Sequence, residues 1–140
     1  MIVLIVEDEA IVAINLALEL ETAGHTIIGP VARCESAIEL ARERRPALAL
    51  VDISLDEPCD GIALARMLKE LDIPSLFLTA QPEAARANAD AALGLIAKPY
   101  TTRDVSESME VLAAVLAGRK PTSYCSALEL FRQPPTTQAK

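Results

Sequence analysis

The sequence predicts an α/β fold, a doubly wound parallel sheet of five strands with helices on both faces. Three observations predict it. Five short apolar runs alternate along the chain with segments whose apolar residues recur at helical spacing. The connections between these segments are short, which favours a parallel sheet with right-handed crossovers. The third run, residues 47–51, is apolar throughout, as expected of a strand that is buried on both faces.

The boundaries of the elements follow from local signals. We expect strands over residues 1–6, 26–29, 47–51, 75–78 and 93–97. The first helix ends before Gly24, a residue type that commonly follows the last turn of a helix. We expect its buried face to consist of Ile11, Ile14, Leu18 and Leu20. Later helices are expected over residues 36–44, 61–68, 83–92 and, capped by Thr101 or Thr102, up to residue 116.

The β/α pattern covers most of the chain but not its end. Five β/α units fill residues 1–117, and we expect one domain there. The pattern changes after Gly118. We expect residues 118–140 to be a C-terminal extension, with a short amphipathic helical stretch within residues 123–132 and then a disordered tail. We expect no second domain and no output domain.

The composition argues against several classes of function. A formal net charge of −7 disfavours a nucleic-acid-binding surface, which requires clustered basic residues. No apolar run approaches the roughly 18 residues of a membrane span, and the N-terminal run lacks the basic start and cleavage site of a signal peptide. The three cysteines, Cys34, Cys59 and Cys125, match neither a disulfide framework nor a zinc site. We therefore expect a cytoplasmic protein with reduced thiols.

Charged and hydroxyl side chains gather where the predicted strands end. Glu7 and Asp8 follow the first strand, and Asp52 follows the third. Thr79 follows the fourth strand, and Lys98 follows the fifth. In an open parallel sheet, ligands bind in the crevice outside the carboxyl ends of the strands. Each residue alone has an ordinary explanation, such as a turn or a helix start, but the five together at one edge indicate a site.

Three carboxylates at one edge require a counter-charge. Two unit charges about 4 Å apart repel each other by about 4 kcal/mol at an effective dielectric constant near 20. Carboxylate oxygens with open positions for water and phosphate suit Mg²⁺. Asp52 is a competent nucleophile that can form an aspartyl phosphate, and the ammonium group of Lys98 can bind a phosphoryl oxygen. The sequence therefore predicts phosphoryl transfer to Asp52 with Mg²⁺ as the cofactor.

These residues, in this order and on these strand ends, resemble the receiver domain of two-component response regulators. The resemblance covers residues 1–117 and implies a flavodoxin-like sheet with the strand order 2-1-3-4-5. It implies that Asp52 is the phosphoacceptor, that Thr79 is the switch hydroxyl and that Lys98 contacts the phosphoryl group.

The resemblance also implies the metal ligands and two tuning positions. Mg²⁺ would be bound by Asp8, Asp52 and the backbone carbonyl of Ser54. Glu7 would act on the metal through water. The residues that tune the lifetime of the phosphoryl group would be Ser54 and Gln81.

The expected switch surface comprises Leu95, Pro99 and Tyr100. The family usually has an aromatic residue three positions before the lysine, and this chain departs from that pattern with Leu95. Tyr100 is expected to belong to a docking surface rather than to replace the switch aromatic. The Lys98–Pro99 peptide bond is expected to be cis.

The predicted function is signal transduction by a stand-alone, single-domain response regulator in a two-component phosphorelay, and not enzyme activity. A histidine kinase or a histidine phosphotransfer protein would phosphorylate Asp52, and a downstream protein target would bind the switched surface of the phosphoprotein. A homodimer through the face of the fourth helix, fifth strand and fifth helix is a further expectation. Neither a nucleic acid nor a membrane is expected as a partner.

Two alternatives stay open. The first is a receiver-like docking or dimerisation module that signals without phosphate, which Leu95 favours. The second is an aspartyl-phosphate phosphatase of the haloacid dehalogenase type. That chemistry requires a general acid two residues after the nucleophile, where this chain has Ser54, and a cap domain, so it is disfavoured.

Overall fold

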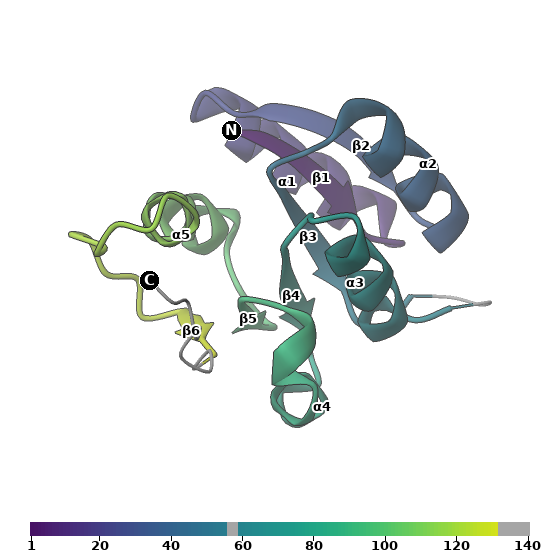
Figure 1. Cartoon of the computed structure of the whole chain (residues 1–140). Coiled ribbons are helices and arrows are strands. Elements are labelled where there is room, and N and C mark those ends of the chain that lie inside the picture. The colour runs from purple at the N-terminus through teal and green to yellow at the C-terminus, as the bar shows by residue number, and fades with distance from the viewer. Residues whose placement is uncertain (56–58, 132–140) are drawn as a thin grey trace.

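The computed structural model describes residues 1–55 and 59–131, which form a three-layer α/β structure (Figure 1). The middle layer is a six-stranded sheet with the order β2-β1-β3-β4-β5-β6. β1 to β5 run parallel, and β6 pairs antiparallel with β5. The predicted fold class and the order of the five parallel strands are confirmed, and β6 adds a strand that the prediction lacks. Among the described residues, no helix combines the length and the apolarity needed to cross a bilayer.

Most element bounds lie within two residues of the predicted ones, α4 excepted. The strands are β1 (Ile2–Val6), β2 (Thr26–Val31), β3 (Leu48–Asp52), β4 (Ser75–Thr79), β5 (Gly94–Ala97) and β6 (Leu128–Leu130). The helices are α1 (Ala10–Thr22), α2 (Cys34–Arg44), α3 (Gly61–Glu70), α4 (Pro82–Ala87) and α5 (Thr102–Leu116), with a 3₁₀ turn at Ala89–Ala91. Thr101 caps α5, because its hydroxyl accepts a hydrogen bond from the Asp104 amide at 3.0 Å.

Helices cover both faces of the sheet, which explains why the central strands are apolar throughout. α1 and α5 cover one face, where Ile5, Leu16 and Leu112 belong to one buried core. α2 and α3 cover the other face, where Leu4 and Leu64 belong to a second core. Full burial of such side chains stabilises a fold by about 1.5–3 kcal/mol each relative to exposure. The two cores therefore hold the sheet rigidly between its helical layers.

The buried face of α1 differs from the predicted one, of which only Leu20 is buried. Ile11, Ile14 and Leu18 are 76%, 55% and 56% exposed. The residues that face the core are Ala13, Leu16, Ala17 and Leu20. Both sets are apolar and both recur at helical spacing, so periodicity alone cannot choose between them. As a result, α1 presents an apolar stripe to solvent.

α4 is shorter than predicted, and the helix expected over residues 83–92 is wrong beyond Ala87. Asn88 leaves the helical conformation, and its side-chain amide bonds back to the last turn. Arg66 of α3 donates hydrogen bonds to Asn88 Oδ1 at 2.8 Å and to the Asp90 carboxylate at 2.7 Å. Contacts with a distant helix therefore decide where α4 ends, and local sequence does not reveal them.

The C-terminal segment forms a strand, so the helical stretch predicted within residues 123–132 is wrong where the structure describes it. Without Leu128–Leu130, β5 would be an edge strand with unpaired backbone groups, and the pairing satisfies them. A three-residue strand has too few residues to show a period of its own. The tail predicted after this stretch lies in residues 132–140, outside the described part of the chain.

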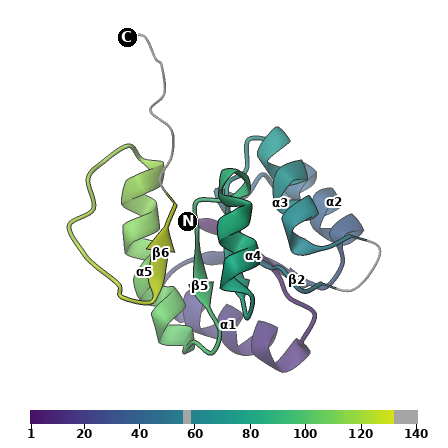
Figure 2. The ribbon, with the colours of Figure 1, turned by 90° about the horizontal axis from the view of Figure 1, so that it is seen from below.

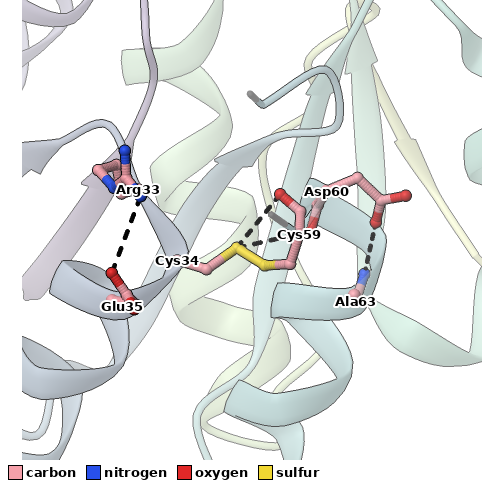
Figure 3. The surroundings of a disulfide bond; sticks show 6 residues. All are labelled: Arg33, Cys34, Glu35, Cys59, Asp60 and Ala63. Carbon is pink, nitrogen blue, oxygen red and sulfur yellow. Dashed lines mark hydrogen bonds and ion pairs between the residues drawn. A yellow bond between two sulfur atoms is a disulfide. The ribbon is translucent and has the colours of Figure 1, made fainter. Parts of the chain in front are cut away.

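Cys34 and Cys59 form a disulfide, so the expectation of reduced thiols is wrong for this pair (Figure 3). Cys34 begins α2 and Cys59 lies just before α3. The two helices pack side by side on one face of the sheet, which brings Cα atoms that are 25 residues apart in sequence to 6.3 Å. Cys125 is free and buried. Because tertiary packing creates the pair, the spacing of the cysteines could not predict it.

Breaking this disulfide should destabilise the chain. The bonded cysteines are 25 residues apart, and a cross-link closing a loop of that size contributes about 3.5 kcal/mol in the chain-entropy model. We expect the C34S/C59S variant to melt roughly 10 °C below the oxidised wild type in calorimetry. The reduced wild type should match the variant, and reductant should not shift the variant further. Equal melting temperatures for oxidised and reduced wild type would contradict a stabilising bond.

Candidate functional site

The carboxyl ends of β1, β3, β4 and β5 lie at one edge of the sheet and carry the predicted site residues. Glu7 and Asp8 follow β1, Asp52 ends β3, Thr79 ends β4 and Lys98 follows β5. The parallel register aligns these ends across the sheet. Polar residues placed at these points of the strands are therefore delivered to the same crevice.

Three carboxylates form a compact cluster there. One oxygen from each of Glu7, Asp8 and Asp52 lies within 4.8 Å of the other two. Glu7 and Asp52 are only 2% and 3% exposed, whereas Asp8 is half-buried. The Oε2 atom of Glu7 accepts a hydrogen bond from the Glu9 amide at 3.1 Å. The Oε1 atom of Glu7 is buried and has no hydrogen-bond donor among the residues that the structure describes.

Lys98 brings a positive charge into this cluster. Its Nζ atom donates a hydrogen bond to Asp52 Oδ2 at 3.0 Å and lies 3.6 Å from Glu7 Oε1. Partial burial alone would lower the pKa of Lys98, but the hydrogen bond to Asp52 and the charge of Glu7 outweigh it and raise the pKa. The lysine is therefore held in its charged form beside Asp52.

The pKa of Glu7 is raised to about 7, mainly by burial and further by the negative charge of Asp52. Burial and the charge of Glu7 likewise raise the pKa of Tyr100 to about 12. Glu7 therefore keeps its proton up to about pH 7, and a cation bound at the cluster could replace that proton.

The donor set of the cluster fits a small hard cation. Carboxylate oxygens are the ligands that Mg²⁺ prefers. Mg²⁺ usually keeps several bound waters, and one of these could donate a hydrogen bond to Glu7. A divalent ion would offset negative charge in the cluster and give a ligand contact to Glu7 Oε1, which accepts no hydrogen bond from the described residues. The Ser54 amide donates to Asp52 Oδ1 at 2.9 Å. The carbonyl of Ser54 as a metal ligand stays a prediction.

The loop after β4 holds the Thr79 hydroxyl in place. Thr79 is fully buried, and its Oγ1 accepts a hydrogen bond from the Gln81 amide at 2.7 Å. The side-chain amide of Gln81 donates to Ser54 Oγ at 3.3 Å. The two predicted tuning positions therefore contact each other, and one of them also binds the predicted switch hydroxyl. The Lys98 amide donates to the Thr79 carbonyl at 2.7 Å, which links β5 to the same loop.

The predicted switch-surface residues lie in two different places. Leu95 is 2% exposed and belongs to a core with Phe77 and Phe131, behind the site edge. Pro99 and Tyr100 line a hollow of about 400 Å³ beside Lys98. The Lys98–Pro99 peptide bond is cis, as predicted.

Gly61 packs directly on the backbone of Asp52 and is absent from the predicted site. Its amide donates to the Ile53 carbonyl at 2.9 Å. A Cβ atom at Gly61 would overlap the Asp52 carbonyl oxygen, so only glycine fits. The sequence carries one signal for this role. Gly61 is the first residue of α3, directly after the cap residue Asp60. Because glycine is a poor helix former, its presence there indicates that another part of the backbone approaches it closely.

Replacing Glu7 with glutamine should weaken the dependence of the protein's stability on pH between about pH 4.5 and pH 7. In metal-free protein the folded state keeps the Glu7 proton up to about pH 7, whereas the unfolded state releases it near pH 4.5. The unfolded state therefore binds fewer protons in this window, and stability falls as the pH rises through it. We expect melting temperatures measured with EDTA to fall less steeply with pH in E7Q than in the wild type.

The matched control for this experiment is E9Q. Glu9 is an exposed carboxylate two residues away and 4.0 Å from Lys98 Nζ, so its loss should leave the slope almost unchanged. If E7Q kept the wild-type slope, the assignment of the titration to Glu7 would be wrong.

Comparison with known proteins places this geometry in a family. Residues 3–110 match the family model described as the response regulator receiver domain. The chain is 36% identical over 107 residues to the phyllosphere-induced regulator PhyR of Methylorubrum extorquens, a match that covers 74% of this chain and 40% of PhyR. It is 32% identical over 113 residues to the transcriptional regulatory protein PdtaR of Mycobacterium tuberculosis, covering 78% of this chain and 55% of PdtaR. The chain thus spans about half the length of these relatives, or less.

A solved structure shows the same fold. The signal receiver domain of a modulated diguanylate cyclase from Desulfovibrio desulfuricans G20 superposes with a TM-score of 0.74 at 31% identity. The match covers 83% of this chain and 95% of that domain. The matched residues include the five parallel strands, except for Ile2 at the start of β1, and the residues of the acidic edge, but not β6. The chain therefore belongs to the response regulator receiver domain family.

Proposed function

We propose that this chain is a phosphoacceptor in a two-component phosphorelay. Asp52 receives a phosphoryl group from a histidine kinase or a histidine phosphotransfer protein, and a protein target then binds the altered surface. As a receiver domain, the chain acts in signalling and not as an enzyme. The proposal rests on one observation above all: the buried Asp52 carboxylate is hydrogen-bonded by Lys98 at 3.0 Å beside two further carboxylates.

Asp52 is positioned to act as the nucleophile. One of its oxygens attacks the phosphorus of the donor phosphohistidine, and an O–P bond forms while the P–N bond breaks. The electron pair of the broken bond returns to the imidazole nitrogen. The Lys98 ammonium, held at Asp52 Oδ2, stabilises the negative charge of the transferred phosphoryl group. The Ser54 amide orients the other carboxylate oxygen.

The acidic cluster is the proposed Mg²⁺ site. Asp8, Asp52 and the Ser54 carbonyl would bind the ion directly, and Glu7 would act through water. When bound, Mg²⁺ supplies positive charge that offsets the cluster, so that an anionic donor can approach. Glu7 would then release its proton, because the negative charge that helps to raise its pKa to about 7 would be compensated.

Phosphorylation would change the hydrogen bonds around Thr79. A phosphoryl group adds about −1.5 to −2 charges and three acceptor oxygens, by analogy with other phosphorylated side chains. The Thr79 hydroxyl now accepts from the Gln81 amide, and turning it toward the phosphoryl group would break that bond and move the loop before α4. The contact between Gln81 and Ser54 would change with it, which is how these positions would tune the lifetime of the phosphoryl group.

The exposed stripe of α1 is the proposed docking surface for the phosphodonor. Ile11, Ile14 and Leu18 lie on one side of this helix, which begins directly after the acidic segment that ends at Glu9. An apolar stripe at this spacing fits the apolar face of a partner helix. A donor helix packed there would lie next to the site edge that carries Asp52.

The similar proteins support a role in regulation. PhyR is named as a regulator and PdtaR as a transcriptional regulatory protein. The match covers 40% of PhyR and 55% of PdtaR, so what the remaining parts of these proteins do is not carried over to this chain. We therefore propose for this chain only phosphoryl-controlled binding of a protein target, with a homodimer as a second form of the same response.

Phosphorylation by a small donor tests the assignment of Asp52. Acetyl phosphate with Mg²⁺ should add the mass of one phosphoryl group to the wild type and none to D52N. K98A should be phosphorylated at least about ten-fold more slowly, because it loses the cation beside the nucleophile. D72N is the matched control, since Asp72 is exposed and far along the chain from the acidic segment. A wild type that gains no mass would favour the docking module that works without phosphate.

A charge on the α1 stripe should separate the two kinds of donor. I14E should slow transfer from a phosphorylated histidine kinase or phosphotransfer protein by about ten-fold or more, because it places a charge in an apolar interface. Its rate with acetyl phosphate should stay at the wild-type value, since that donor needs no docking surface. M67E, on the 39% exposed Met67 of α3, is the control. If the protein donor phosphorylated I14E and M67E at equal rates, the donor would bind a surface other than the α1 stripe.

A further inference from the structure

β6 lies at the surface formed by α4, β5 and α5, with β5 between β6 and α4 (Figure 2). β6 pairs antiparallel with β5 in the register Gly94 to Leu130 and Ile96 to Leu128. The Phe131 amide continues the pairing with a 2.9 Å hydrogen bond to the carbonyl of Leu93. We call residues 125–131 the strap.

Side chains from α4, β5 and α5 hold the strap. Glu129 accepts two hydrogen bonds from the guanidinium of Arg86 on α4, at 2.8 and 2.9 Å. Phe131 is 9% exposed and belongs to one core with Leu95 of β5. Cys125 is buried, with its Sγ 3.4 Å from Ser108 Oγ on α5. Backbone pairing, an acidic residue and an aromatic residue two positions later thus define the bound segment.

Gly94 adapts this edge of the sheet to a strand. A Cβ atom at Gly94 would collide with the carbonyl oxygen of Glu129 and lie 3.0 Å from the Cα of Leu130. The three atoms nearest to that position all belong to the backbone of the strap. Glycine inside a strand weakens it unless another backbone approaches closely. The edge is therefore shaped for an added strand.

The strap is also connected to the residues of the site. Leu95, which shares its core with Phe131, lies three residues before Lys98. It pairs with Phe77 of β4, two residues before Thr79, and Phe77 belongs to the same core. A change in the strap and a change at the site edge therefore act on the same two strands.

We propose that the β5 edge is a strand-binding site that the chain's own strap occupies, and that an extended segment of a protein partner binds there by displacing the strap. The partner segment would carry an acidic residue to meet Arg86 and an aromatic residue two positions later. In strand addition, main-chain hydrogen bonds supply affinity and pockets for alternate side chains supply specificity. A tethered occupant competes at high effective concentration, so the site stays closed until the strap is loosened. This inference concerns a different surface from Asp52 and does not depend on phosphorylation.

The test uses the full chain and a fluorescent synthetic peptide with the sequence of residues 123–131. In E129R, the introduced arginine is repelled by Arg86, which loosens the strap and leaves the site itself intact. Fluorescence anisotropy should show the peptide binding to E129R at least about ten-fold more tightly than to the wild type. F131A, which removes the aromatic anchor instead, should have the same effect.

Two matched variants test where the peptide binds and what holds the strap. G94A/E129R has a loosened strap but a blocked edge, and it should bind no peptide. R86E/E129R restores an ion pair with reversed charges and closes the site again, so its amide exchange over residues 128–131 should return to the slow rate of the wild type. Amide exchange monitors the strap directly. It should be faster over residues 128–131 in E129R and F131A, with β1 to β4 unchanged.

Three results would overturn the proposal. One is amide exchange at residues 128–131 that neither E129R nor F131A accelerates, which would make the strap a fixed part of the sheet. Another is a strap that loosens while the peptide binds no more tightly than to the wild type. The third is a wild-type dimer with exchanged straps, seen in sedimentation, which would replace the intramolecular occupant with a second copy.

Discussion

The repulsion among three carboxylates at one edge of the sheet is the constraint on which the site depends. Glu7 and Asp52 are almost completely buried. The ammonium nitrogen of Lys98 lies 3.0 Å from an Asp52 oxygen and 3.6 Å from a Glu7 oxygen. The fold can keep this arrangement because helices on both faces hold the strand ends rigidly, and Gly61 allows α3 to begin directly against the Asp52 backbone. The excess charge is also what makes the site responsive, because a cation, a proton or a phosphoryl group changes the balance.

The loop after β4 connects that balance to the rest of the molecule. Thr79 is bonded to the Gln81 amide, and Gln81 reaches Ser54 beside the nucleophile. On the other side, the Lys98 amide bonds to the Thr79 carbonyl. A movement of the hydroxyl therefore cannot occur without a change in the β4–α4 loop. Leu95, the departure from the family pattern, lies in a core that Phe131 of the C-terminal segment completes, so an aromatic ring is present in that core although position 95 lacks one.

Two apolar features lie on different sides of the fold. The α1 stripe of Ile11, Ile14 and Leu18 is open to solvent beside the acidic edge. The core under Phe131 is covered by the strap, which joins α4, β5 and α5. A donor bound on α1 and a target bound at β5 would not compete for the same surface. This separation is what a protein needs if it is to receive a signal from one partner and deliver it to another.

The five parallel strands and the identity of the edge residues could be predicted from the residues themselves, because strand ends are marked by local changes from apolar to polar residues. The order of the strands followed from the resemblance to receiver domains. Glu7, Asp8, Asp52 and Lys98 could be grouped from those ends alone, since parallel strands bring them to one edge. Four features depend on packing: which apolar side of α1 is buried, where α4 ends, the pairing of Cys34 with Cys59 and the addition of Leu128–Leu130 to the sheet. Hydrophobic periodicity does not decide which side of α1 is buried, because both sides are apolar. The end of α4, the disulfide and the pairing of β6 each depend on residues more than 20 positions away in the sequence. Local sequence carries no record of such contacts, so the packing of the whole chain decides them.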